Sequence, residues 1–270
     1  PAWPSDCCWN GARLMPRFAI KIEYDGTPFM GWQYQEHGPS AQAVVMQAFK
    51  AFTGQDLKIY ASGRTDAGVH ALGQVIHVDI DSDRFDANRV REALNGCLRP
   101  HPVAALDVIE VDEDFHARFS CTGRAYRYVI INRRPGLTLD RERAWLVKSR
   151  LDADAMNQAA QALVGHHDFT SFRAILCQAK SPIKTLDSLR VWRTGERVIV
   201  ETAARSFLHN QVRNMVGTLV EVGAGRQSVA WVKDVLEAKN RQVSGPKAPA
   251  CGLYFLRANY PEKYRWSSDA

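Results

Sequence analysis

The sequence predicts an α+β fold built from two halves, each mixing strands with about two helices. Hydrophobic residues alternate with polar ones at a period of two in several segments, which is typical of half-buried strands. In other segments they recur at helical spacing, and the two kinds of segment do not alternate strictly as in a parallel βαβ protein. With 270 residues, the chain can bury one large core or two small ones.

In the first half, residues 17–24 alternate hydrophobic and polar side chains, which predicts a half-buried strand. Ser40 can cap a helix that ends at Gly54, because the hydrophobic residues between them recur on one helical face. Asp86 can cap a second helix, which ends at Gly96. The other strand-like segments of this half are residues 57–62, 75–80 and 102–111.

The second half repeats this mixture. Asp152 can cap a helix that ends at Gly165, and a clear helical stripe of hydrophobic residues runs over positions 208–220. Residues 166–168 are expected to connect the first of these helices to the next strand, and a shorter helix is expected around residues 229–239. The predicted strands are residues 126–131, 186–193, 197–203 and 253–258.

Composition narrows the class of protein. The net charge of +6 and the pI near 9.1 suit a polyanionic partner such as nucleic acid, although many basic proteins never bind one. The basic residues include Arg-rich clusters around 124–134 and 141–150, which on their own usually indicate only a solvated face. No hydrophobic run approaches the roughly 18 residues that a membrane helix needs, so no membrane association is expected.

The cysteines indicate a reduced, cytoplasmic protein, because none of the six forms a C-x-x-C pair. The lack of clustered thiolates or imidazoles also argues against a metal such as zinc. Residues 1–15 lack the pattern of a secretory signal and are expected to form a poorly ordered leader.

The richest segment for chemistry is residues 62–71, a predicted loop between two strand-like stretches. Gly63 and Gly68 permit tight backbone turns around Arg64 and Asp66. By composition alone, this segment is either a functional loop or a turn that an aspartate caps beside a surface arginine.

The run G-R-T-D-A-G-V-H-A at residues 63–71 resembles the signature of the tRNA pseudouridine synthase A (TruA) family. Other segments match that family in the same order, and the resemblance extends over roughly residues 17–264. These segments are Tyr24–Thr27, Gly31–Gln33, Phe115–Arg118, Arg124–Tyr128, Asp168–Arg173, Phe207–Leu208, Val212–Gly217 and Gly252–Tyr254.

The resemblance implies an isomerase that converts uridine to pseudouridine at positions 38, 39 and 40 of the tRNA anticodon stem-loop. The reaction is redox-neutral and implies no cofactor, in keeping with the lack of a phosphate-binding G-x-x-x-x-G-K-[ST] loop and of a G-x-G-x-x-G fingerprint. It also implies two ferredoxin-like halves that form an extended mixed sheet with a central basic cleft, and a homodimer. We expect an N-terminal half at residues 16–112, carrying the catalytic loop, and a C-terminal half at 113–270.

The resemblance assigns five site residues. Asp66 matches the catalytic carboxylate, which attacks ribose C1′, attacks uracil C6 or assists glycal formation. By its spacing of two residues from Asp66, Arg64 can orient the carboxylate, whereas the resemblance implies that it helps to displace and replace the flipped nucleotide. The resemblance also implies that Tyr126 stacks on the uracil and can serve as a general base. Arg213 is expected to pair with Asp66 or to contact phosphate, and Leu253 to line an apolar pocket. None of the histidines is expected to take part in catalysis.

Residue patterns without the resemblance leave plainer alternatives open. Periodicity alone favours a core strand residue for Tyr126, does not distinguish Leu253 from a core residue, and leaves Arg64 open as a surface arginine. Rival functions are a catalytically silent RNA-binding protein and a hydrolase of small N-glycosides, although the latter needs a second acid or base. A serine hydrolase is disfavoured because no G-x-S-x-G motif is present.

Overall fold

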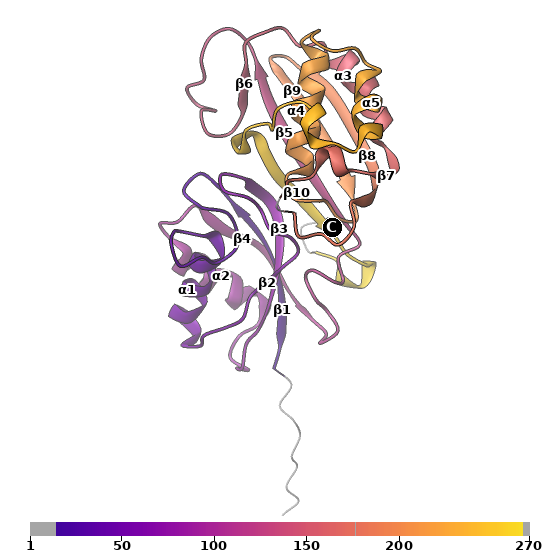
Figure 1. Cartoon of the computed structure of the whole chain (residues 1–270). Helices are drawn as coiled ribbons and strands as arrows, with labels where there is room; N and C mark the ends of the chain where they lie inside the picture. Colours follow the sequence, from indigo (N-terminus) through magenta and orange to yellow (C-terminus); the bar gives the residue numbers. More distant parts are fainter. Residues whose placement is uncertain (1–14, 176, 267–270) are drawn as a thin grey trace, which may run out of the picture.

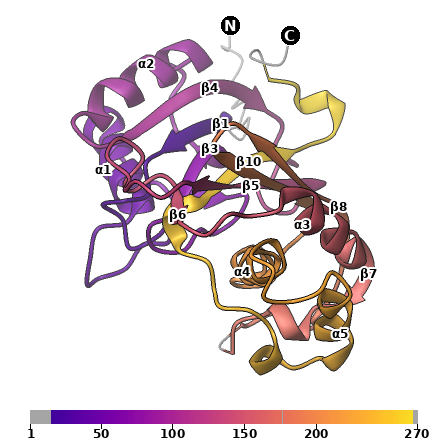
Figure 2. The ribbon, with the colours of Figure 1, turned by 90° about the horizontal axis from the view of Figure 1, so that it is seen from above.

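The structure, a computed structural model, describes residues 15–175 and 177–266. Positions 1–14 of the expected leader lie outside this range. In the part of the chain that the structure describes, ten strands form one mixed sheet in the order β4-β1-β3-β10-β5-β9-β8-β7, with β2 beside β3 and β6 beside β5. The halves lie one above the other in Figure 1, and Figure 2 shows the same arrangement from above.

The first half has the βαββαβ pattern of a ferredoxin-like unit, with the strand order β4-β1-β3-β2 and antiparallel neighbours. Helices α1 and α2 pack against each other on this half (Figure 1). Its elements are β1 (Arg17–Tyr24), α1 (Ala41–Thr53), β2 (Tyr60–Ala61), β3 (His70–Asp79), α2 (Ala87–Leu98) and β4 (Val103–Val111).

The second half repeats the pattern as β5-α3-β8-β9-α4-β10, with the strand order β10-β5-β9-β8 and antiparallel neighbours. Strands β6 and β7 and helix α5 are added to it. Its elements are β5 (Gly123–Asn132), β6 (Trp145–Val147), α3 (Ala153–Ala160), β7 (Gly165–Asp168), β8 (Ile183–Thr194), β9 (Arg197–Ala204), α4 (Gln211–Gly223), α5 (Trp231–Ala238) and β10 (Leu253–Asn259). The predicted α+β class with two ferredoxin-like halves is confirmed.

Strand β10 joins the two halves. It pairs with β3 in parallel, through Tyr254 opposite His70 and Phe255 opposite Ala71, and with β5 in antiparallel orientation. Side chains from both ends of the second half's sequence complete the core of the first half. These side chains are Phe115, Ala117, Cys121, Phe255, Ala258, Tyr264 and Trp266.

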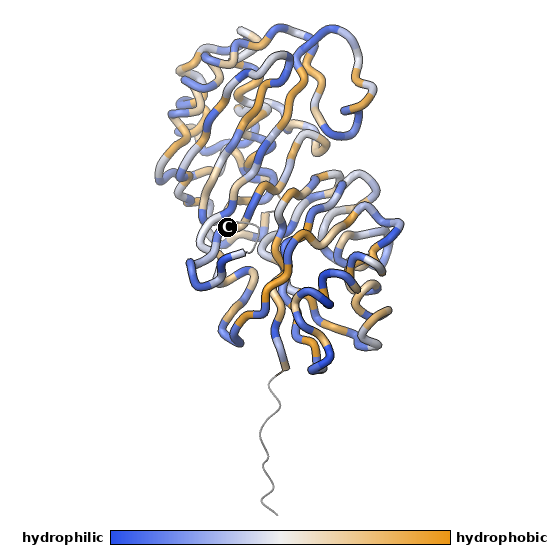
Figure 3. The backbone as a smooth tube through the Cα atoms, turned by 180° about the vertical axis from the view of Figure 1, so that it is seen from behind, coloured by the Kyte–Doolittle hydropathy of each residue, from blue (hydrophilic) through white to orange (hydrophobic). Residues whose placement is uncertain are grey.

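Local sequence explains the helix boundaries. The Ser40 side chain accepts a hydrogen bond from the Ala43 amide at 3.2 Å, and Gly54 ends α1 with a left-handed φ of 74°. Asp86 caps α2 by accepting from the Arg89 amide at 2.8 Å. Figure 3 shows hydrophobic stretches interrupted by hydrophilic positions along the strands of both halves, the pattern that predicted them.

Several predicted boundaries in the second half were wrong. Residues 165–168 form strand β7, paired with β8, rather than a connection. Helix α3 ends at Ala160 and continues only as a 3₁₀ turn, Gln161–Leu163. Helix α4 begins at Gln211 rather than at Leu208, because Asn210 adopts a left-handed φ of 62° that no helix accommodates.

Boundaries also differ around the predicted functional loop. Strand β3 starts at His70, five residues before the predicted position 75, because pairing with both β1 and β10 recruits His70 and Ala71 into the sheet. Strand β2 is only two residues long, where residues 57–62 were predicted. The loop that presents Asp66 is therefore residues 62–69.

No helix of the described residues is long and apolar enough to cross a membrane. Among the same residues, no group of histidine, cysteine and acidic side chains could hold a metal ion. The cysteines at 97, 121, 177 and 251 are free thiols.

Candidate active site

The loop of residues 62–69 lies against the segment that follows β1. The Trp32 amide donates to the Thr65 carbonyl at 3.1 Å, and the Val69 amide donates to the Asp66 carbonyl at 3.1 Å. Gly31 has a φ of 102°, and a side chain at this position would come within 2.6 Å of the Thr65 carbonyl oxygen. This close approach explains why a glycine precedes Trp32, and it fixes the backbone on both sides of Asp66.

A network of buried polar side chains packs against the loop and hydrogen-bonds to it. The Tyr24 hydroxyl lies 2.7 Å from Thr65 Oγ1 and accepts from Gln74 Nε2 at 3.4 Å. Gln74 Nε2 also donates to the Gly63 carbonyl at 3.0 Å, and Ser62 Oγ donates to Gln74 Oε1 at 3.1 Å. Burial raises the pKa of Tyr24 well above its usual value, so the phenol stays neutral and its proton is free to go to Thr65. The network makes the loop a rigid platform.

Asp66 meets its charged partners across the boundary between the halves. Arg213 Nη1 lies 3.5 Å from Asp66 Oδ2, and His209 Nε2 lies 3.2 Å from Asp66 Oδ1. The Asp66 side chain remains 31% exposed, so a substrate can still reach the carboxylate. Arg213 lies in the first turn of α4 and His209 two residues before that helix, both in the second half, whereas Asp66 belongs to the first. The carboxylate is thus complete with its partners only when the two halves are joined.

Arg213 is itself held in place. Its Nε donates to the Ala248 carbonyl at 2.8 Å, its Nη1 lies 3.3 Å from Asn210 Oδ1, and its side chain is only 12% exposed. Asn210 is the residue whose left-handed backbone precedes α4. The local backbone therefore aims this guanidinium at Asp66, as predicted for one of the two roles of Arg213.

Tyr126 lies on β5 beside the loop. A side-chain carbon placed on Gly63 would be 4.0 Å from its hydroxyl, and its ring meets Phe207 and Phe255 edge to face, each at 5.1 Å between ring centroids. Burial raises the pKa of Tyr126 well above its usual value, and the nearby charge of Asp66 adds to the rise. A phenol that stays neutral favours the predicted stacking role over that of a general base.

Leu253 and Arg64 are placed differently from each other. Leu253 is buried at the start of β10, opposite Tyr128 and on the same face of the strand as Phe255, next to Tyr126. Arg64 is exposed, and among the described residues no hydrogen bond or ion pair holds it to Asp66. The structure thus places Arg213 against Asp66 and Tyr126 beside the loop, whereas the exposed Arg64 side chain contacts neither of them through a hydrogen bond or ion pair among the described residues.

His209 contacts Asp66 although no role in the site was expected for it from the sequence. Its signal was its place four residues before Arg213, the spacing at which two residues lie on one helical face. The left-handed Asn210 breaks that helix, yet both side chains still reach Asp66.

Comparisons with known proteins identify relatives of this chain. A family model described as tRNA pseudouridine synthase matches residues 20–120 and 159–261, the two segments that supply Asp66 and Arg213. Three proteins named tRNA pseudouridine synthase A are similar over almost their whole length. They come from Azorhizobium caulinodans (54% identity; 92% of this chain, 96% of the relative), Parvibaculum lavamentivorans (54%; 91% and 100%) and Rhodospirillum centenum (55%; 91% and 100%).

Among solved structures, one from a Cbf5–Nop10–Gar1 complex aligns with 84% of this chain and 60% of its own, at 12% identity and a TM-score of 0.35, a similarity too low to carry an argument. The family model alone spans well over half of the chain, and the relatives are more than half identical to it. The chain that presents Asp66 between its two halves therefore belongs to the tRNA pseudouridine synthase family.

Proposed function

We propose that this protein isomerises uridine to pseudouridine at positions 38, 39 and 40 of the tRNA anticodon stem-loop, with Asp66 as the catalytic carboxylate. One observation carries the assignment of Asp66. Its carboxylate, on a rigid loop of one half, faces Arg213 and His209 of the other half beside an aromatic side chain. The tRNA substrate follows from the names of the family and its relatives.

The reaction needs few groups. The N1–C1′ bond of uridine breaks, a C5–C1′ bond forms, the hydrogen on C5 leaves as a proton, and N1 gains a proton. No electrons are gained or lost overall, so no oxidant or reductant is required. Asp66 serves as nucleophile at C1′ or at C6, or removes a proton on the way to a glycal, and its single exposed carboxylate fits each route.

Access to the uracil requires extrusion from the base stack, which costs a few kcal/mol. The neutral ring of Tyr126, set between Phe207 and Phe255, supplies a stacking surface for the extruded base. Leu253 extends the apolar wall on the same face of β10. The exposed Arg64, two residues before Asp66, takes the position that the flipped nucleotide leaves.

Arg213 and His209 act through Asp66. Arg213 brings a fixed positive charge to one carboxylate oxygen, and His209 brings a donor, or a charge when protonated, to the other. With both oxygens contacted, the carboxylate has one orientation toward the reacting atoms. Because each partner comes from the second half, the relative position of the halves controls that orientation.

We further propose a cytoplasmic homodimer that binds tRNA in a basic cleft between halves at residues 16–112 and 113–270. The net charge of +6 supports binding of tRNA, and the free thiols among the described residues support a reduced, cytoplasmic setting. The homodimer rests on the family resemblance alone. Light scattering of the purified protein, with and without tRNA, tests the dimer, since a monomeric mass in both samples contradicts it.

The deciding experiment uses tRNA transcripts labelled with tritium at uracil C5. Bond formation between C5 and C1′ expels the C5 hydrogen, so tritium release measures the isomerisation. We expect release by the wild type and none by Asp66→Asn, with no metal or nucleotide added. Sequencing of the product for modified uridines at 38, 39 and 40 then tests the positions.

Other outcomes identify the rival functions. Tight tRNA binding without tritium release by well-folded wild type would indicate a silent RNA-binding protein. Release of free uracil from a nucleoside would indicate an N-glycoside hydrolase, because the isomerase keeps the base attached to the ribose.

A further inference from the structure

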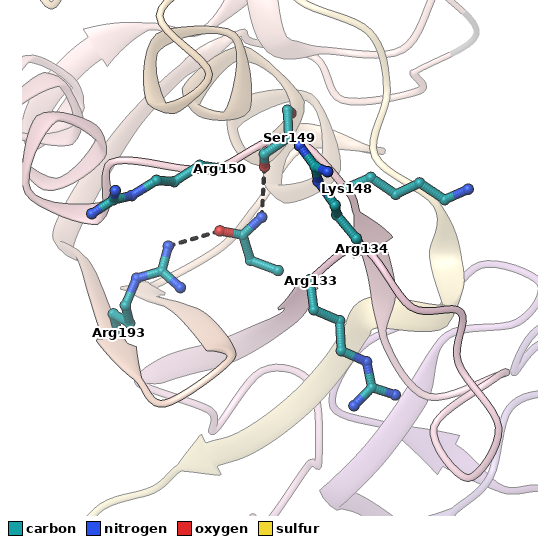
Figure 4. Close-up of a pocket in the computed structure, with 7 residues that line it drawn as sticks. Arg133, Arg134, Lys148, Ser149, Arg150 and Arg193 are labelled. Carbon is teal, nitrogen blue, oxygen red and sulfur yellow. Dashed lines mark hydrogen bonds between the residues drawn. The ribbon is translucent and has the colours of Figure 1, made fainter.

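A hollow of about 480 Å³ opens at the far end of β5 from the Asp66 site. Three segments distant in sequence contribute to it: the end of β5 with the residues after it, the residues after β6, and the end of β8. Figure 4 shows the seven side chains in place. They are Asn132, Arg133, Arg134, Lys148, Ser149, Arg150 and Arg193, and we call this surface the basic hollow.

Asn132 holds the frame of the basic hollow together. Its Nδ2 donates to the carbonyls of Val147 and Ser149 at 2.8 and 2.6 Å. Its Oδ1 accepts from the Leu151 amide at 3.0 Å and from Arg193 Nη2 at 2.8 Å. One amide thus uses its full hydrogen-bonding capacity to tie three segments together, so the hollow has a defined shape.

The cations of the basic hollow fall into two groups. Arg133 pairs with Glu196 at 2.9 Å, and Arg193 donates to Asn132 and to the Leu151 carbonyl. Both guanidinium groups are thus bonded within the protein and help to fix the shape of the hollow. Arg134, Lys148 and Arg150 are exposed and have no hydrogen bond or ion pair with any other described residue. No carboxylate lines the hollow, so the charge of these three side chains is available to a ligand.

The lining selects the chemistry of that ligand. All seven lining residues are polar and none is aromatic, so the hollow offers no aromatic ring on which a nucleobase could stack. Arginine and lysine side chains without partners are the groups that contact backbone phosphates in nucleic-acid complexes. The volume exceeds that of one phosphate group, which favours a stretch of sugar–phosphate chain over an isolated anion.

The position of the basic hollow relates it to the catalytic site. Asn132 is six positions beyond Tyr126 on β5, a separation of about 20 Å at roughly 3.3 Å per residue. An even separation puts both side chains on one face of the strand. A tRNA with its target uridine at Asp66 is large enough for its backbone to reach the hollow over this distance.

We propose that the basic hollow is a second phosphate-binding site, which grips the backbone of the tRNA at a distance from the reacting uridine. This inference rests on the proposed function, because tRNA is its ligand. The site recognises charge and not sequence, so it positions the RNA while the surroundings of Asp66 carry out the chemistry.

The test compares wild type with the triple variant Arg134→Ala/Lys148→Ala/Arg150→Ala. The readout is the affinity for full-length tRNA transcripts as a function of salt concentration. The slope of log K against log[salt] is negative, and each lost phosphate contact reduces its magnitude by about 0.7 to 0.9. For the three lost cations we therefore expect the magnitude of the slope to fall by about 2. At about 0.1 M salt, affinity should fall by tenfold or more, with the loss of tritium release appearing in KM.

Two further variants serve as controls. Lys50→Ala/Arg89→Ala/Arg91→Ala removes the same charge from the outer helices, where each cation already has a carboxylate partner, and should leave the slope unchanged. Arg134→Lys/Arg150→Lys keeps the charge of the basic hollow and should retain most of the affinity.

The outcomes separate this inference from the proposed function. A triple variant with the wild-type slope and affinity overturns the inference, whether or not tritium is released. An equal loss in the control triple also overturns it, since only net charge would then matter. Micromolar binding of inorganic phosphate that the triple variant loses, with tRNA affinity unchanged, would likewise exclude an RNA site. Absence of tritium release by wild type contradicts the proposed function without affecting the slopes.

Discussion

The Asp66 site and the basic hollow lie on the same molecule, but they hold their charged groups in different ways. At Asp66, the carboxylate is paired with Arg213, and Arg213 is in turn bonded to a backbone carbonyl and to Asn210. In the basic hollow, a fully bonded amide frames three cations that have no partner among the described residues. Charged side chains that are fixed by partners within the protein suit catalysis, which needs a fixed geometry. Charged side chains without partners suit the binding of a ligand that brings its own negative charge.

The largest expected effect tests whether the Asp66 carboxylate takes part in the reaction. Asp66→Asn keeps the size of the side chain but removes the carboxylate, so single-turnover tritium release should fall by a factor of at least about 10³. Affinity for tRNA should stay within about threefold of wild type, because the backbone contacts remain. An Asp66→Asn protein that still turns over would remove Asp66 from the mechanism.

The next effect tests the orientation of the carboxylate. Arg213→Lys keeps a positive charge but loses the fork that reaches both Ala248 and Asp66, so the rate should fall by about 10²-fold. His209→Gln, which retains a donor, is the matched comparison and should cost about tenfold or less. Equal rates for Arg213→Lys and wild type would show that the ion pair does not position Asp66.

A third prediction compares how substitutions in the loop of residues 62–69 and in the basic hollow change the free energy of unfolding. Thr65→Val removes the hydroxyl that pairs with the buried Tyr24 hydroxyl at 2.7 Å and leaves it only the 3.4 Å contact with Gln74, so the fold should be destabilised by roughly 1–3 kcal/mol. The Arg134, Lys148 and Arg150 triple variant should change stability by less than about 0.5 kcal/mol, because these side chains have no partners to lose. Urea denaturation of both proteins checks the contrast, and similar losses would contradict it.

The smallest effect concerns Tyr126. A phenol whose pKa lies well above its usual value keeps its proton at neutral pH, so Tyr126→Phe should lower the rate by tenfold at most. Tyr126→Leu, which removes the ring, should cost about 10- to 100-fold through lost stacking. The raised pKa also means that folding stability is intact below about pH 10 and falls as the pH rises above it. A rate that requires deprotonation of Tyr126 near neutral pH would contradict the stacking role.

Much of the fold could be predicted from local patterns, as three capped helices show. Ser40, Asp86 and Asp152 each accept backbone amide hydrogen bonds at the helix starts predicted for them. Strand β7 could not be predicted, because Gly165–Asp168 lacks hydrophobic alternation and owes its conformation to pairing with β8. The early start of β3 likewise depends on β10, a partner more than 180 residues away in the sequence.

In the candidate site, too, some residues could be predicted from the sequence and others could not. Asp66 and its loop were identifiable because a short motif carries them, and Arg213 because it belongs to another. His209 belongs to no such motif, and its contact with Asp66 depends on a left-handed Asn210 and on the docking of two halves. The basic hollow was even less accessible: its cations come from Arg-rich clusters that each looked like a solvated surface, plus the distant Arg193.

The central place of β10 has a consequence for how the protein is made. Ribosomes deliver the chain from its N-terminal end, and early segments generally fold as they emerge. Here the strand that joins both halves of the sheet is Leu253–Asn259, and Phe255 completes a core whose other members begin at Phe18. Asp66 and Arg213 therefore come together only after nearly all of the sequence has been synthesised, so a stalled or truncated nascent chain lacks an assembled site for modifying RNA.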